Sequence, residues 1–175
     1  MKINLPNLLV ILRIALIPVF LFFFLDPAFN RIIPMAVFLI AAFSDFLDGH
    51  LARKWGTVSN FGKLMDPLAD KMLVSAAMVA LVYVQELSAW AVVIIICREF
   101  WVTSLRMLAL EQGKEVIAAS IWGKIKTVLQ VIMLTVLIWG IFPGTLSIIL
   151  VYLAVIATVL SAAEYTKSYK DVFKA

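Results

Sequence analysis

Residues 145–165 have the sequence TLSIILVYLAVIATVLSAAEY, in which no charged side chain occurs before Glu164. At a rise of about 1.5 Å per residue, a helix of roughly 20 residues crosses the hydrocarbon core of a bilayer. Five other apolar runs precede this one, separated by short polar segments. The six expected spans are residues 8–25, 32–52, 62–84, 88–110, 117–140 and 145–165. Open strands would leave backbone groups without hydrogen bonds in lipid. The sequence therefore predicts an all-α, polytopic membrane protein with six transmembrane helices.

The composition excludes an ordinary soluble domain. The chain of 175 residues is 64% apolar and only 15% charged, and its mean hydropathy is +1.05. A core of this size cannot hide so much apolar surface from water. The single Cys97 cannot form an intrachain disulfide, which excludes a secreted disulfide scaffold. No domain boundary is visible, so residues 1–175 are expected to form one membrane domain with no nucleic-acid partner.

The basic residues predict the orientation in the membrane. With six spans both termini lie on one side, and the opposite side carries Arg31 alone. The side of the termini collects eight basic residues: Lys2, Arg53, Lys54, Lys63, Lys114, Lys167, Lys170 and Lys174. By the positive-inside rule, both termini are cytoplasmic and the protein is a multi-pass protein of the cell (inner or plasma) membrane. Residues 1–12 leave two alternatives, a short interfacial helix or a first span that begins near Pro6.

Four carboxylates near the cytoplasmic ends of the second and third spans form a candidate metal site. Asp45 and Asp48 are three residues apart, and Asp66 and Asp70 are four apart, so each pair lies on one helix face. Converging carboxylates repel one another unless a cation or a proton neutralises them. Oxygen ligands favour Mg2+ or Mn2+ over Zn2+. Four carboxylates are enough for two such ions, an arrangement suited to phosphoryl transfer and to an active site on the cytoplasmic side.

The alternative interpretation is that these acids are helix-end carboxylates held in ion pairs. The basic residues available for such pairing are Arg53, Lys54, Lys63 and Lys71. Burying four acids costs more than such pairing usually returns, which favours the metal site.

Small residues and one arginine accompany the acids in the pattern Asp45-x2-Asp48-Gly49-x2-Ala52-Arg53-x8-Gly62-x3-Asp66-x3-Asp70. At all eight fixed positions, this pattern resembles the signature of the CDP-alcohol phosphotransferase family. The resemblance implies six transmembrane helices around a polar cavity that is open to the cytoplasm, usually in a homodimer. It also implies that an alcohol attacks the phosphorus on the diacylglycerol side of CDP-diacylglycerol and releases CMP.

The same resemblance implies a role for each position of the signature. The residues that match the metal ligands are Asp45, Asp48, Asp66 and Asp70, and Asp70 also matches the catalytic general base. The residues that match the CDP-binding positions are Asp48, Gly49, Ala52, Arg53 and Gly62.

Basic residues inside the expected spans indicate a phosphorylated acceptor. These residues are Arg13, Lys71, Arg98, Arg106, Lys124 and Lys126, and Glu99 is expected to neutralise only one of them. Cations at such depth face a polar interior or snorkel to the headgroups, and Arg and Lys bind phosphate oxygens. The candidate acceptor phosphate site comprises Arg98, Arg106, Lys124 and Lys126. The alternatives are an ion pair of Arg98 with Glu99 or Glu164, and snorkelling of the two lysines.

Further segments, spread over nearly the whole chain, resemble those of bacterial phosphatidylglycerophosphate synthases. They are Leu5-Pro6-Asn7-Leu8 through Arg13, Cys97-Arg98-Glu99-Phe100, Thr103-Ser104-Leu105-Arg106, Gly123-Lys124-Ile125-Lys126-Thr127, and Glu164-Tyr165 before Asp171-Val172-Phe173-Lys174. This resemblance implies sn-glycerol 3-phosphate as the acceptor, phosphatidylglycerophosphate as the product and a place in phosphatidylglycerol synthesis. The alternatives are another acceptor (inositol phosphate, serine or a second phosphatidylglycerol) and, from another class of protein, a divalent-cation transporter.

Overall fold

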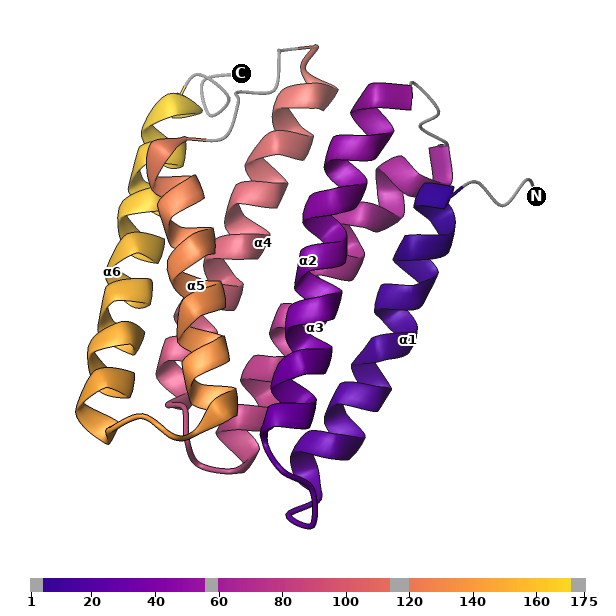
Figure 1. Cartoon of the computed structure of the whole chain (residues 1–175). Helices are drawn as coiled ribbons and strands as arrows, with labels where there is room; N and C mark the ends of the chain where they lie inside the picture. The colour runs from indigo at the N-terminus through magenta and orange to yellow at the C-terminus, as the bar shows by residue number, and fades with distance from the viewer. Residues whose placement is uncertain (1–4, 56–59, 114–119, 171–175) are drawn as a thin grey trace. The chain divides into compact units, whose positions relative to one another are not determined.

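The computed structural model describes the backbone of residues 5–55, 60–113 and 120–170, and the side chains of 11–44, 69, 71–113 and 120–170. Within these ranges the chain forms six helices (Figure 1). They are α1 (Leu5–Leu25), α2 (Ile32–Trp55), α3 (Asn60–Tyr83), α4 (Ala89–Glu111), α5 (Ile121–Trp139) and α6 (Gly144–Ser168). Their ends agree with the expected spans to within a turn. The all-α prediction is confirmed.

Helix α1 begins at Leu5 and continues without a break to Leu25. Pro6 lies in its first turn, where the missing N–H group has no helical partner to lose. This continuity favours a first helix that begins near Pro6 over a separate interfacial helix. Residues 1–4 lie outside the described residues.

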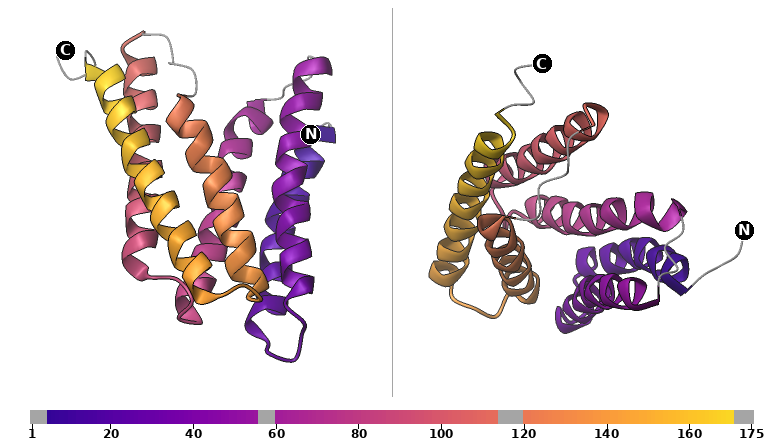
Figure 2. Two further views of the ribbon diagram at one scale, coloured as in Figure 1. Left: turned by 60° about the vertical axis from the view of Figure 1, so that its left-hand side comes forward. Right: turned by 90° about the horizontal axis from the view of Figure 1, so that it is seen from above.

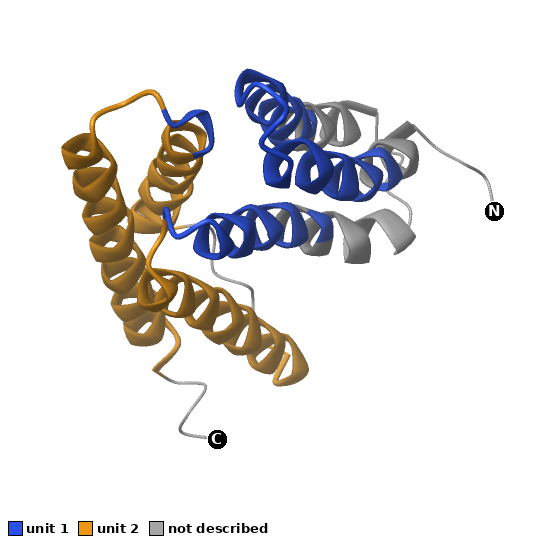
Figure 3. Cartoon of the chain, turned by 90° about the horizontal axis from the view of Figure 1, so that it is seen from below, with its two compact units in different colours: residues 1–86, 138–140 blue, residues 87–137, 141–175 orange. Residues whose placement is uncertain are grey.

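The contacts along the chain define two compact units, coloured separately in Figure 3. Unit 1 comprises residues 1–86 and 138–140, and unit 2 comprises residues 87–137 and 141–175. In unit 1, α1 packs against α2 and α3, and α2 also contacts α3. Phe20 packs against Phe24 and Phe38 in the core of this unit, with ring centroids 5.4 and 6.2 Å away.

In unit 2, α4 packs against α6, and the two helices can be followed in Figure 2. Helix α6 buries small and polar residues, among them Ala154, Ala157 and Ser161. Its large apolar residues point outward instead, and Ile156 and Tyr152 are 53% and 65% exposed. Small residues let membrane helices approach closely while large apolar side chains contact lipid. The pattern of α6 is that of a membrane helix.

Two helices in the described part of the chain, α5 and α6, are long and apolar enough to cross a membrane. Shorter apolar stretches occupy residues 11–25, 32–44 and 71–83. The apolar sequence of α4 contains three charged residues, Arg98, Glu99 and Arg106.

A bidentate ion pair joins the beginning of α2 to the end of α3 within unit 1. Arg31 Nη1 lies 2.7 Å from Glu86 Oε2, and Arg31 Nη2 lies 2.6 Å from Glu86 Oε1. The Arg31 guanidinium also lies over the ring of Phe24, with Cζ 5.3 Å from the centroid. Gly140 has a φ of +71°, and a Cβ added there would lie 3.0 Å from Arg31 Nη1. Glycine is required at this position both by the backbone conformation and by the neighbouring guanidinium.

We expect Gly140→Ala to destabilise the protein by about 1 kcal/mol or more, because alanine at positive φ is strained and its Cβ crowds Arg31. The measurement is the thermal unfolding midpoint of the detergent-solubilised protein. Gly144→Ala is the matched control, because a Cβ at Gly144 meets nothing within 4 Å. Equal unfolding midpoints for the two variants would contradict the prediction.

Candidate active site

The signature residues divide between α2, which carries Asp45 and Asp48, and α3, which carries Asp66 and Asp70. These two helices contact each other, as the short connection between them predicts. The side chains of all eight signature positions lie outside the described residues. Their roles in metal and CDP binding therefore stay predictions. The positions of these residues along α2 and α3 are the structural information that the chain offers on them.

On α2, the two acidic positions continue a face that is buried further along the helix. Phe38 and Ala41 are fully buried in the core of unit 1. Asp45 and Asp48 follow Ala41 at spacings of four and three, which keep successive residues on one helix face. The spacing therefore predicts that both acids share the face of Phe38 and Ala41.

On α3, the acids precede the corresponding buried face. Leu73 and Ala77 are fully buried. Asp70 lies three residues before Leu73, and Asp66 lies four residues before Asp70. The spacing thus predicts that each acidic pair continues a buried face of its helix. Because α2 and α3 contact each other, we expect the like charges of the two pairs to come close together. The donor set contains carboxylate oxygens alone, which suits a hard divalent cation.

A buried cation lies on α1, the helix of unit 1 that carries none of the four acids. Arg13 of α1 is 1% exposed, and α1 packs against both helices that carry the acids. Lys71, the other basic residue expected in a span of this unit, is only partly buried. A guanidinium withdrawn from solvent in this way requires polar or charged surroundings.

The acceptor-site candidates belong to unit 2, where Glu99 of α4 contacts two of them. Glu99 Oε1 lies 2.8 Å from Arg98 Nη1 and 2.5 Å from Lys126 Nζ of α5. The Arg98–Glu99 ion pair, one of the alternatives for Arg98, is therefore present. Glu99 contacts two cations but carries a single negative charge, so it neutralises only one of them, as expected.

Arg98 and Arg106 both converge on Tyr165 of α6. Arg98 Nη2 donates a hydrogen bond to Ser161 Oγ, and its Cζ lies 5.4 Å from the centroid of the Tyr165 ring. Arg106 Nη2 donates to the Tyr165 hydroxyl at 2.9 Å, and its Cζ lies 5.3 Å from the same centroid. Arg106 has no carboxylate partner in the part of the chain that the structure describes, and its buried Nε has no hydrogen-bond acceptor there.

Lys124, the fourth acceptor-site candidate, lies in the first turn of α5 and is exposed. Among the described side chains, its ammonium group makes no hydrogen bond or ion pair, and it does not join the network around Glu99. The structure thus brings together Arg98, Arg106 and Lys126 through Glu99 and Tyr165, and leaves Lys124 at the surface of its helix.

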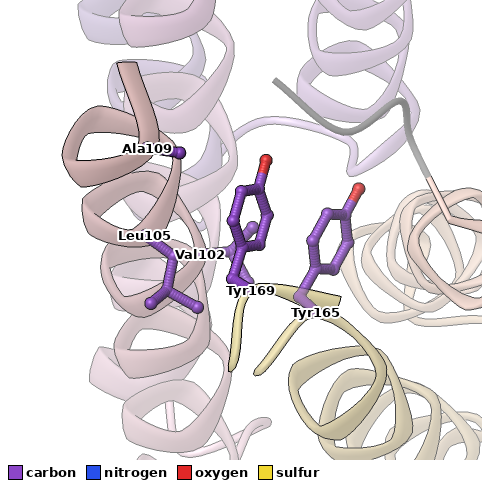
Figure 4. Close-up of a cluster of buried hydrophobic side chains, with 5 residues drawn as sticks. All are labelled: Val102, Leu105, Ala109, Tyr165 and Tyr169. Atoms are coloured by element: carbon purple, nitrogen blue, oxygen red, sulfur yellow. The ribbon is translucent and has the colours of Figure 1, made fainter. Parts of the chain in front are cut away.

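Sequence reasoning missed Tyr165 and Ser161 as parts of this network. Tyr165 is almost fully buried in a cluster with Val102, Leu105 and Ala109 of α4 (Figure 4). The signal was present in the sequence, because Ser161 and Tyr165 lie four residues apart and place polar atoms on one face of a mostly apolar helix.

Known proteins match nearly the whole chain. The profile of a family described as CDP-alcohol phosphatidyltransferase matches residues 3–160. A Bacillus subtilis protein is 43% identical over 98% of this chain and 97% of its own. A Haemophilus influenzae protein is 40% identical over 97% and 95%, and one from Rickettsia bellii 36% over 97% of each. All three are named CDP-diacylglycerol–glycerol-3-phosphate 3-phosphatidyltransferase. The chain belongs to the CDP-alcohol phosphatidyltransferase family.

Proposed function

We propose that this protein transfers the phosphatidyl group of CDP-diacylglycerol to sn-glycerol 3-phosphate and releases CMP. The observation that carries the proposal is the agreement, over nearly full length, with relatives that are named for this reaction. The acceptor hydroxyl oxygen bonds to the phosphorus on the diacylglycerol side, and the pyrophosphate bond from that phosphorus to CMP breaks. The product is phosphatidylglycerophosphate, which places the protein in phospholipid synthesis.

In this proposal the signature on α2 and α3 binds the CDP-diacylglycerol half. Asp45, Asp48, Asp66 and Asp70 hold two Mg2+ ions, or Mn2+ in their place, because the donor set is made of carboxylate oxygens. When bound, such ions neutralise the negative charge that phosphoryl transfer develops on phosphate oxygens. The position of the two acidic pairs on two helices that contact each other supports this assignment.

The remaining signature residues act on the nucleotide and on the acceptor hydroxyl. Asp70 accepts the proton of that hydroxyl, as the family resemblance implies. Arg53 donates hydrogen bonds to phosphate or ribose oxygens of CDP. Gly49, Ala52 and Gly62 leave room for the nucleotide because they have small side chains or none.

The acceptor phosphate binds to the basic cluster of unit 2. Arg98 and Lys126 share Glu99, whereas Arg106 has no carboxylate partner among the described residues. The cluster therefore carries excess positive charge, and Arg106 offers an unoccupied buried donor to a phosphate oxygen. Lys124 adds a further cation at the first turn of α5, where the positive end of the helix dipole also favours an anion.

We further propose the arrangement in the membrane that the sequence and the family imply. All six helices span the bilayer around a polar cavity open to the cytoplasm, and both termini are cytoplasmic. Residues 1–175 form a single family domain, and two copies of the chain form a homodimer in the cell membrane.

The decisive test of the function is CMP release from CDP-diacylglycerol by the purified protein, with and without glycerol 3-phosphate and Mg2+. We expect turnover only when both are present. Inositol phosphate, serine and phosphatidylglycerol are assayed as acceptors in parallel. Faster CMP release with one of these than with glycerol 3-phosphate would overturn the acceptor assignment.

Neutralising Arg106 or Lys124 tests the acceptor site. Arg106→Gln and Lys124→Gln are each expected to weaken glycerol 3-phosphate binding by about 1.5–3 kcal/mol, because a hydrogen bond to a charged group is lost. The KM for CDP-diacylglycerol is expected to change little. Lys167→Gln, at an exposed lysine in the last turn of α6, is the control. An unchanged dependence on glycerol 3-phosphate in both site variants would show that these cations are structural.

A further inference from the structure

Tyr165 contacts three parts of unit 2 at once. Its ring lies beneath both Arg98 and Arg106 of α4, as the distances to the two guanidinium carbons show. Its hydroxyl accepts one hydrogen bond from Arg106 Nη2 at 2.9 Å and another from the backbone N–H of Ser120 at 3.1 Å. Ser120 directly precedes α5, so this one phenol oxygen connects α4, α6 and the beginning of α5.

The beginning of α5 is shaped to receive this hydroxyl. Ser120 Oγ accepts a hydrogen bond from the Gly123 N–H at 3.0 Å, which fixes the first turn of the helix. A Cβ added to Gly123 would lie 3.3 Å from Tyr165 Cε2, 3.4 Å from its hydroxyl oxygen and 3.2 Å from Ser120 Oγ. The absence of a side chain at Gly123 therefore lets the tyrosine approach the Ser120 N–H.

Arg106 depends on Tyr165 for its orientation. No carboxylate holds its guanidinium in the described part of unit 2, and the Tyr165 hydroxyl is the hydrogen-bond partner that the structure shows for it. An arginine side chain free to rotate loses up to about 2 kcal/mol of conformational entropy when a ligand immobilises it. A tyrosine that holds the guanidinium in advance reduces that loss at the moment of binding.

We propose that Tyr165 is a positioning residue of the acceptor site, whose hydroxyl and ring orient the Arg106 and Arg98 guanidinium groups toward a phosphate monoester. The inference rests on the proposed function, in which Arg106 binds the phosphate of the acceptor. Tyr165 does not take part in the transfer itself. Its contribution is to the affinity for the acceptor and not to the binding of CDP-diacylglycerol.

Tyr165→Phe tests the inference because it removes the hydroxyl and keeps the ring. We expect the KM for glycerol 3-phosphate to rise about five- to tenfold, the usual effect of losing one hydrogen bond, with kcat and the KM for CDP-diacylglycerol nearly unchanged. In the double variant Tyr165→Phe/Arg106→Gln, this KM should equal that of Arg106→Gln alone, because residues that act through one contact are not additive.

Thr166→Val is the matched structural control. It removes the hydrogen bond from Trp101 Nε1 to Thr166 Oγ1, 2.8 Å long, which joins the same two helices one residue further along α6. This bond does not involve either arginine. The KM for glycerol 3-phosphate should therefore stay at the wild-type value in Thr166→Val.

Gly123→Ala provides a second route to the same measurement if Tyr165→Phe folds poorly. It keeps the hydroxyl but crowds the tyrosine ring, while alanine suits a helix better than glycine. Like Tyr165→Phe, it should raise the KM for glycerol 3-phosphate. Both variants are compared with wild type by thermal unfolding in detergent.

The outcomes separate the inference from the proposed function. An Arg106→Gln variant with an unchanged KM for glycerol 3-phosphate overturns the acceptor site itself, and the inference with it. A raised KM in Arg106→Gln together with wild-type values in Tyr165→Phe and Gly123→Ala overturns only the positioning role. An equal rise in the KM for glycerol 3-phosphate and the KM for CDP-diacylglycerol in Tyr165→Phe would likewise show that Tyr165 serves folding alone. Additive effects of the two substitutions on the KM for glycerol 3-phosphate in the double variant would show the same.

Discussion

Replacing Asp70 with Asn is expected to reduce turnover by about 10²- to 10⁴-fold, the usual contribution of a general base, while the protein stays folded. Asn has nearly the same shape as Asp but cannot accept the hydroxyl proton, and it is a poorer ligand for a hard cation. Asp66→Asn should cause a loss of similar size through the metal site alone. The measurement is the initial rate of CMP release at saturating concentrations of both substrates.

The same variants have a second expected effect, on stability. In the proposed metal site the carboxylates repel one another when no divalent cation is bound, so each Asn variant should unfold in chelator at the same temperature as wild type or higher. Mg2+ should raise the unfolding midpoint of wild type because it binds the folded protein. This Mg2+-induced increase should be lost or reduced in Asp66→Asn and Asp70→Asn. Thermal unfolding with chelator and with Mg2+ measures both effects.

Asp26→Asn is the control for these substitutions. Asp26 follows α1, outside the signature, and its Oδ1 accepts a hydrogen bond from the Ala28 N–H at 2.9 Å, a role that the Asn oxygen can keep. This variant should retain both wild-type turnover and the response to Mg2+. Full turnover of wild type in excess chelator, or near-wild-type turnover of Asp70→Asn, would refute the metal-dependent mechanism.

The helices could be predicted because the physical constraint on them is local. A bilayer requires apolar runs of a set length, and the six runs in this sequence coincide with the six observed helices to within a turn. The inward placement of the acids stays a prediction, because their side chains lie outside the described residues. Spacings of three and four fix one helix face, and Phe38 and Leu73 show that these faces are buried further along α2 and α3.

The network of unit 2 could not be predicted, because it depends on where long side chains bend. Arg98 and Arg106 are eight residues apart, about 12 Å along the helix axis. Their spacing alone therefore does not predict that they contact the same side chain. Both guanidinium groups nevertheless reach the ring of Tyr165, which is far away in the sequence. Local pattern places Ser161 and Tyr165 on one face of α6 but does not identify the α4 residues that contact them. The sharing of Glu99 between Arg98 and Lys126 depends on tertiary packing in the same way.

Glu99→Gln is expected to destabilise the protein strongly. The side chains of Arg98 and Lys126 are only 9% and 6% exposed, and both contact Glu99 Oε1. Removing the carboxylate takes away the negative charge that both buried cations contact. Breaking a buried pair costs about 3–5 kcal/mol, and we expect about 3 kcal/mol here because 23% of the Glu99 side chain is exposed. Thermal or denaturant unfolding in detergent measures the loss.

Lys126→Met is the matched comparison, because it removes one cation and leaves Glu99 paired with Arg98. It should cost about 1 kcal/mol or less, since replacing a buried charge with an apolar side chain of similar size is often neutral. Glycerol 3-phosphate should then raise the unfolding midpoint of Glu99→Gln more than that of wild type, because the phosphate supplies the negative charge that the variant lacks. Equal destabilisation by the two substitutions would show that the carboxylate is not what stabilises this cluster. A glycerol 3-phosphate shift no larger in Glu99→Gln than in wild type would show that the phosphate binds away from Arg98 and Lys126.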